Sequence, residues 1–148
     1  MQSEITTLAN GLRVITSSRP EIETVSLGIW IKTGSAFETE EMNGISHFLE
    51  HMVFKGTPTR TSFQIDAEIE DAGGQTNAYT SREITSFYAK MLKDDAELAL
   101  DVLADIVLNA SFPDEEVVKE RDVVIQEIKQ TIDTPDDIIF DYLQQQAY

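Results

Sequence analysis

Both histidines of this 148-residue chain lie in one short segment, GISHFLEHMVFKG, together with a glutamate. On a helix of 3.6 residues per turn, His47 and His51 lie one turn apart, and Glu50 falls on the same arc of about 100°. Two imidazoles at this spacing can bind one divalent metal from one face of a helix. The carboxylate of Glu50 would then be placed to accept a proton from water beside that metal.

The other side chains of this segment are mostly apolar, which predicts that the helix is buried. Burying two imidazoles and a carboxylate without partners would cost several kcal/mol, so some compensation is required. A metal would supply it, and so would hydrogen bonds between core histidines and nearby carboxylates. Because the only two histidines share one arc with Glu50, we favour the metal.

A catalytic zinc site takes a third protein ligand and leaves a fourth position to water. The chain has no cysteine and no further histidine, so the third ligand must be Asp or Glu. Glu120 and Glu127 are seven residues apart in EEVVKERDVVIQEIKQ and share one helical face, which the intervening valines predict to be partly buried. One of the two would bind the metal and the other would support a histidine, but spacing does not distinguish them. Glu116 lies on the same side, and an exposed, solvated face is the alternative.

The elements that would position these groups have an α+β pattern. Asn10-Gly11 predicts a hairpin over residues 5–18, and a longer strand is predicted from residue 24 to Gly34. Two more strands are predicted within residues 75–92. Helices are predicted over residues 44–54, 62–72, 94–110, 114–133 and from Pro135 onward.

Composition indicates one globular domain over residues 1–148. Apolar residues make up 41% and charged residues 26%, a normal balance for such a domain. The net charge of -16 disfavours nucleic acid and anionic membranes as partners and favours a cationic one, although solubility alone explains most surface carboxylates. The first residues have no export or transit pattern, and the absence of cysteine suits a reducing compartment.

The residues from 47 to 51 form the H-x-x-E-H motif of the inverzincins. With GGQTNAYTSREITSFYA and ERDVVIQE following in order, the chain from Leu12 to Tyr148 resembles the pitrilysin-type metallopeptidases. It is most similar to the branch that contains the β subunit of mitochondrial processing peptidase and its bacterial relatives. The resemblance implies an antiparallel sheet packed against helices, as in the N-terminal domain of those enzymes. Because the sequence stops at QQQAY within a predicted helix, we expect that domain to be incomplete.

The resemblance assigns roles that spacing leaves open. It implies that His47, His51 and Glu127 bind one Zn2+ per chain, that Glu50 is the general base, and that Glu120 supports the ligands. Two histidines and one glutamate do not select strongly among metals, so manganese and cobalt stay open.

The resemblance also implies a substrate site. Asn77 and Ala78 match an edge strand to which an extended peptide adds as a further strand. The implied function is zinc-dependent cleavage of extended, basic peptides or presequences. The Arg and Tyr that a later domain supplies to the substrate have no counterpart here. We therefore expect the isolated chain to be inactive without the missing C-terminal domains, a homologous partner subunit, or both.

A different class of function stays open as the alternative. Some relatives in this superfamily are non-catalytic structural subunits or peptide-binding partners that have lost the motif. The complete motif favours the enzyme. We expect it in a bacterial cytoplasm, with the mitochondrial matrix as the alternative.

Overall fold

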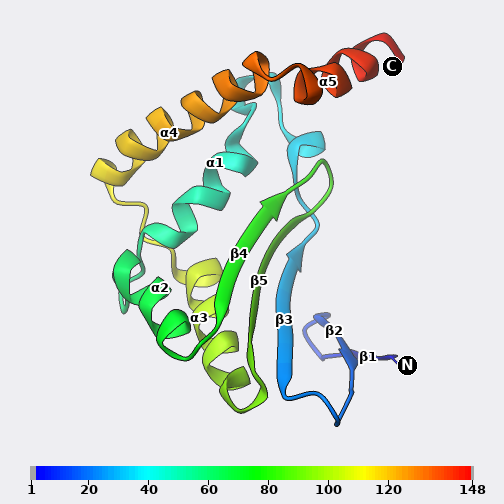
Figure 1. The fold of residues 1–148 in the computed structure, drawn as a ribbon, viewed down its shortest axis with the longest axis vertical. Helices are drawn as coiled ribbons and strands as arrows, with labels where there is room; N and C mark the ends of the chain where they lie inside the picture. Colours follow the sequence, from blue (N-terminus) through cyan, green and yellow to red (C-terminus); the bar gives the residue numbers. More distant parts are fainter. Residues whose placement is uncertain (1–2, 148) are drawn as a thin grey trace.

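The main sheet of the chain is antiparallel and has three strands in the order β3-β5-β4 (Figure 1). It is seen in a computed structural model that describes residues 3–147, so the final residue, Tyr148, lies outside the described part. The strands are β3 (Thr24–Ile31), β4 (Gln75–Thr80) and β5 (Thr85–Leu92). The predicted α+β class and antiparallel sheet are confirmed, with β4 and β3 at the two edges.

Strand β3 ends at Ile31, three residues before the predicted end at Gly34, because the chain there crosses the tip of the β4–β5 hairpin. The amides of Ser35 and Ala36 donate to the carbonyls of Ser81 and Arg82 at 3.2 and 2.8 Å. A Cβ on Gly34 would lie 2.2 Å from the Ser81 carbonyl oxygen, so only glycine permits this approach.

The predicted N-terminal hairpin forms a separate two-stranded sheet of β1 (Ser3–Thr7) and β2 (Arg13–Ser17). Its turn contains Asn10, whose side chain accepts a hydrogen bond from the Leu12 amide, and Gly11 at φ 87. The paired residues Ile5 and Ile15 are both exposed. The hairpin therefore adds nothing to the core.

The core lies between the sheet and the helices α2 (Ser62–Asp71) and α3 (Ala96–Asn109). α2 begins with a capping box between Thr61 and Gln64, which satisfies amides that the first turn leaves unpaired. One face of β5 and the inner faces of both helices supply most of the buried apolar side chains, which include Ile65, Ile69, Phe87, Ala89, Met91, Val102, Leu103 and Ile106.

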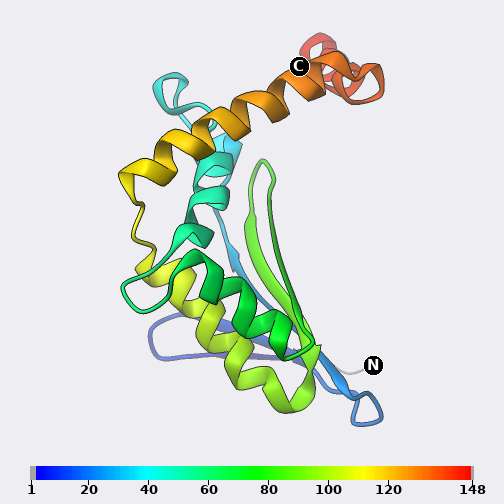
Figure 2. The ribbon, with the colours of Figure 1, turned by 60° about the vertical axis from the view of Figure 1, so that its left-hand side comes forward.

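Helix α1 (Ile45–Met52) packs against both β4 and α4 (Asp114–Asp133), so it joins the edge of the sheet to the outermost long helix. Figure 2 shows α4 crossing α1 at an angle, with α5 (Pro135–Ala147) continuing beyond the end of the sheet. All five predicted helices are confirmed, and α5 begins at Pro135 as expected. Short 3-10 turns occupy Ser35–Phe37, Glu40–Met42, Val53–Lys55 and Lys93–Asp95. Within residues 3–147 no helix has the length and apolar content to cross a membrane.

Candidate metal centre

Helix α1 carries three of the predicted site residues, and the side chain of Glu38 caps its N-terminus. Gly44 adopts φ 90 at the N-cap position, which favours glycine, and it offers no side chain to cap the helix. Glu38 replaces that cap, because its two carboxylate oxygens accept from the amides of Gly44 at 2.7 Å and Ser46 at 2.8 Å. Burial acts to raise the pKa of Glu38, but these hydrogen bonds lower it below its ordinary value. The positive end of the helix is thus matched by a carboxylate.

The prediction that α1 is buried holds for only part of the helix. Ser46 and Met52 are buried, whereas Ile45 and Leu49 are exposed and the side chain of His47 is 41% exposed. The helix packs mainly against β4 and α4, and with these neighbours part of its surface stays open. The polar groups of α1 therefore lie at an accessible face rather than inside the core.

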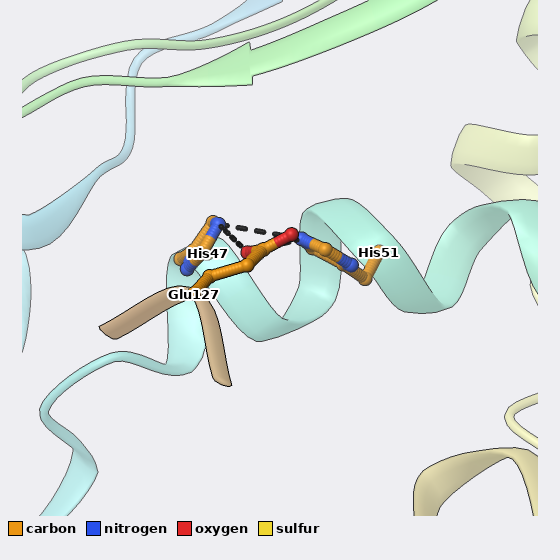
Figure 3. A group of neighbouring side chains, drawn as sticks. All are labelled: His47, His51 and Glu127. Carbon is orange, nitrogen blue, oxygen red and sulfur yellow. Dashed lines mark hydrogen bonds and ion pairs between the residues drawn. The ribbon is translucent and has the colours of Figure 1, made fainter. Parts of the chain in front are cut away.

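Three potential ligand atoms meet between α1 and α4 (Figure 3). The Nε2 atoms of His47 and His51 are 3.3 Å apart, and Glu127 Oε2 lies 3.5 Å from the first and 3.4 Å from the second. Zinc bonds to nitrogen and oxygen of about 2.0 to 2.2 Å give a tetrahedron with edges of about 3.3 to 3.6 Å. The donor triangle therefore has the size of one tetrahedral face.

The side of the triangle formed by His47 and Glu127 is open, with 41% and 45% of the two side chains exposed. A structural zinc site is closed by four protein ligands, whereas a catalytic site leaves a position for water or substrate. The described residues bring three such ligands together, so the cluster has the form of the second kind.

The hydrogen bond at the far side of the His51 ring decides which nitrogen can bind a cation. His51 Nδ1 lies 3.1 Å from Glu120 Oε2, a carboxylate oxygen that can only accept, so in the neutral imidazole Nδ1 carries the proton and Nε2 presents a lone pair. That lone pair faces Glu127 Oε2, another acceptor. A divalent cation bound by all three atoms satisfies this contact, as does a further proton on one of the imidazoles, and the two-histidine, one-carboxylate set suits a divalent metal.

Glu120 is the buried member of the predicted glutamate pair, with 9% of its side chain exposed. Its Oε1 lies 2.6 Å from Lys55 Nζ, and its Oε2 lies near His51. Burial acts to raise the pKa of Glu120, but the hydrogen bonds from Lys55 and His51 lower it below its ordinary value. Glu120 thus remains a carboxylate that can hold the His51 ring.

The other three glutamates differ in what they contact. Glu127 is half-exposed, so with the buried Glu120 it forms the partly buried face that the sequence predicts. Glu116 forms an ion pair with Lys119 and does not reach the histidines. The Glu50 carboxylate has no hydrogen bond or ion pair to any other residue that the structure describes, so both of its oxygens can accept a proton.

Asn77 and Ala78 lie on β4, an edge strand as predicted. The Ala78 amide donates to Asn77 Oδ1 at 2.8 Å rather than to β5, so it points away from the sheet. Because backbone groups alternate along an antiparallel strand, Thr76 and Thr80 present theirs on the same free edge. Thr80 Oγ1 also lies 3.4 Å from the Ser46 carbonyl, which places this edge beside the first turn of α1.

Sequence reasoning missed two residues at this centre, Glu38 and Lys55. Lys55 follows His51 by four residues, and this i to i+4 spacing was a signal that could have placed it near the site. Glu38 lies six residues before Gly44, the N-cap residue of α1. Since capping residues normally adjoin the helix, nothing in the local sequence indicates its role.

Comparisons with known proteins agree with this geometry. A family model described as Insulinase (Peptidase family M16) matches residues 13–148. The chain is 48% identical to a probable mitochondrial-processing peptidase subunit beta of Arabidopsis thaliana, over 99% of this chain and 28% of the relative. It is 49% identical to an uncharacterized zinc protease, YmxG, of Bacillus subtilis, over 96% of this chain and 35% of the relative.

A solved structure also matches, that of a protease from Helicobacter pylori. Its TM-score is 0.88 at 28% identity, over 94% of this chain and 34% of the other. The chain thus spans about a third of the length of the proteins it matches. The family model covers nearly all of it, and the chain belongs to the insulinase family of peptidases, M16.

Proposed function

We propose that this chain carries the zinc centre of an endopeptidase that acts on extended, basic peptides or presequences. The observation that carries the proposal is the triangle of His47 Nε2, His51 Nε2 and Glu127 Oε2, with sides of 3.3 to 3.5 Å. The family and the relatives named as zinc proteases support the same chemistry. One zinc ion per chain is proposed.

Each residue of the centre has a distinct role in this proposal. His47, His51 and Glu127 would hold the metal, and Glu120 would keep the proton on His51 Nδ1. Bound zinc supplies a Lewis acid that polarises a carbonyl and makes nearby water more acidic. Glu50 would accept a proton from water at its free carboxylate and return it to the leaving amine.

Strand β4 would bind the substrate backbone. Its free edge offers main-chain donors and acceptors from residues 76, 78 and 80, which can pair with an extended peptide of varied sequence. Asn77 Oδ1 occupies the Ala78 amide in the structure, so a substrate carbonyl would replace the Asn77 side chain there. The net charge of -16 favours a basic peptide.

Turnover is proposed to need more than these residues. The matched relatives are about three times as long as the part that this chain covers. We propose that further domains of the same chain, or a homologous partner subunit, complete the substrate site. The relatives include a bacterial protein and a probable subunit of a mitochondrial peptidase. We propose a bacterial cytoplasm or a mitochondrial matrix as the compartment.

Metal content of the purified chain, with His51→Ala and Glu50→Gln as matched variants, tests this proposal. We expect about one zinc per wild-type chain, loss of zinc in His51→Ala, and retention in Glu50→Gln, because only the first variant removes a ligand. In a longer protein that cleaves peptides, Glu50→Gln should lower kcat by about 100- to 10,000-fold. Zinc retained by His51→Ala would refute the ligand assignment, and full activity of Glu50→Gln would refute the base. Absence of metal from the wild-type chain would favour a non-catalytic relative.

A further inference from the structure

Lys55 ends the 3-10 turn that follows α1, and its ammonium lies inside the structure rather than in bulk water. The Lys55 side chain is 24% exposed, and Nζ lies 2.6 Å from Glu120 Oε1. Glu120 is more deeply buried, with 9% of its side chain exposed. Charged side chains this buried normally need a partner, so this ion pair is unlike the exposed pairs on the surface of α4.

The two oxygens of Glu120 have different partners. Oε1 accepts from Lys55, whereas Oε2 accepts from His51 Nδ1 at 3.1 Å. A carboxylate held at both oxygens cannot rotate without breaking one contact. The His51 ring is therefore oriented by a group that is itself fixed, and its Nε2 points to Glu127 and His47.

We infer that Lys55 is a positioning residue for the metal centre: its ion pair fixes the Glu120 carboxylate, which in turn fixes the His51 ring for a divalent cation. The inference rests on the proposed zinc function and adds to it a residue outside the ligand set and the H-x-x-E-H motif. Lys55 also links the end of α1 to α4, the two helices that supply the ligands.

The positive charge of Lys55 would by itself oppose a second cation nearby. Glu120 lies between Lys55 and His51, and at 2.6 Å the carboxylate largely neutralises the ammonium. The field of the pair at the ligand triangle is therefore small. Loss of orientation acts directly on a ligand, and substitutions of outer hydrogen-bond partners commonly weaken metal binding about 10- to 100-fold. Positioning should therefore outweigh repulsion.

The test compares zinc dissociation constants of wild type and Lys55→Met, measured by competition with a chromogenic chelator. Methionine keeps an apolar stem and removes the charge, and we expect about tenfold weaker binding. Lys55→Arg should restore most of the affinity. Lys119→Met is the matched control. Lys119 is next to Glu120 in the sequence, but its ammonium pairs with Glu116 instead. It should bind zinc as wild type does.

A second readout separates positioning from a merely structural role. Nitrogen-15 NMR of the imidazole rings in the zinc-loaded protein reports the proton on His51 Nδ1 and the metal on Nε2. We expect these signals to shift or broaden in Lys55→Met and to stay unchanged in Lys119→Met. A structural role would lower the unfolding midpoint while leaving the ring signals and the affinity of the folded protein unchanged. If Lys55→Met does not fold, Lys55→Gln takes its place. Glutamine keeps a donor to Glu120 but has no charge, and we expect it to bind zinc more weakly than wild type by less than about tenfold.

The outcomes distinguish this inference from the proposed function. If the wild-type chain binds zinc, and Lys55→Met and Lys55→Gln bind it equally well or more tightly, only the role of Lys55 is overturned. Absence of zinc binding in wild type would overturn the proposed function, and this inference with it.

Discussion

Two polar clusters join elements that are far apart in the sequence, and they differ in whether their charges are matched. The candidate metal centre comprises His47, His51 and Glu127. The arginine cluster is centred on Arg60, which forms ion pairs with Glu68 on α2 and with Asp101 and Asp105 on α3. Both are rich in titratable groups, but only one leaves acceptors facing acceptors.

Within the arginine cluster, donors and acceptors are paired around Asp105. Its Oδ2 accepts from Arg60 at 2.9 Å and from the hydroxyls of Thr57 and Thr59 at 2.8 and 2.9 Å, and its Oδ1 accepts from Asn109 at 2.9 Å. Burial acts to raise the pKa of Asp105, but these donors hold it well below its ordinary value. Desolvation likewise opposes the charge on Arg60, and its carboxylate partners still raise its pKa.

The contrast teaches which feature marks a site. Arg60 and its carboxylates line a surface pocket, yet their hydrogen-bonding groups are already used within the cluster. At the candidate metal centre, His51 Nε2 of the neutral imidazole and Glu127 Oε2 are both acceptors and lie 3.4 Å apart. Unmatched acceptors call for a cation, whereas a matched cluster stabilises the fold.

Zinc removal should have the largest effect that separates the two clusters. With free zinc 1,000-fold above the dissociation constant, bound metal stabilises the folded chain by about 4 kcal/mol. Thermal unfolding with zinc and with EDTA should therefore differ for wild type. His51→Ala should unfold at the same temperature in both, because it lacks a ligand. A zinc effect retained in that variant would place the metal elsewhere.

Asp105→Ala should rank next, with an expected loss of about 3 kcal/mol in the free energy of unfolding. The substitution leaves the largely buried Arg60 guanidinium without one of its carboxylates and leaves two threonine hydroxyls without an acceptor. Urea unfolding of the metal-free chain measures the loss. Zinc affinity of the folded variant should be unchanged, and a parallel loss of affinity would mean that the two clusters are coupled.

Lowering the pH should reproduce part of the loss of stability expected for Asp105→Ala, without a substitution. Because the pKa of Asp105 is lower in the folded than in the unfolded chain, its stabilisation is complete above about pH 4. It is lost as pH falls from there toward the folded pKa. Urea unfolding of the metal-free chain between pH 7 and pH 2.5 should show this decline. Asp105→Asn should show a shallower decline, and equal slopes would contradict the assignment to Asp105.

The sequence predicts the fold and the two candidate histidine ligands because their signals are periodic or local. The pair His47 and His51 share a helical face by their spacing alone, and Asn10-Gly11 predicts the hairpin turn that the structure contains. Spacing alone did not distinguish Glu127 from Glu120 as the third candidate ligand, and only the family resemblance indicated Glu127. The structure then brings Glu127 to the histidines and leaves Glu120 behind the His51 ring.

What the sequence did not predict depends on contacts between remote elements. The apolar residues of α1 predict burial, but the elements packed against the helix, mainly β4 and α4, leave Ile45 and Leu49 exposed. Periodicity reports which residues share a face and says nothing of how much surface a neighbour covers. The pairing of Arg60 with Asp105 also depends on a contact between remote elements. The two residues are 45 positions apart, so no local sequence pattern indicates the pair.

Glu38→Gln should have the smallest effect and tests which end of α1 sets the metal centre. The glutamine keeps one oxygen for the amides of Gly44 and Ser46 but loses the charge that matches the helix dipole. We expect a loss of about 1 kcal/mol in urea unfolding of the metal-free chain. The exposed Glu40, changed to Gln, is the control and should change stability little.

Zinc affinity should change less in Glu38→Gln than in Lys55→Met, because Glu38 holds the first turn of α1 whereas Lys55 acts through Glu120 on the ligand His51. Chelator competition on both variants measures the difference. A larger loss in Glu38→Gln would mean that the position of the whole helix, rather than the orientation of one ring, limits metal binding. The ion pair of Lys55 would then matter mainly as a link between α1 and α4.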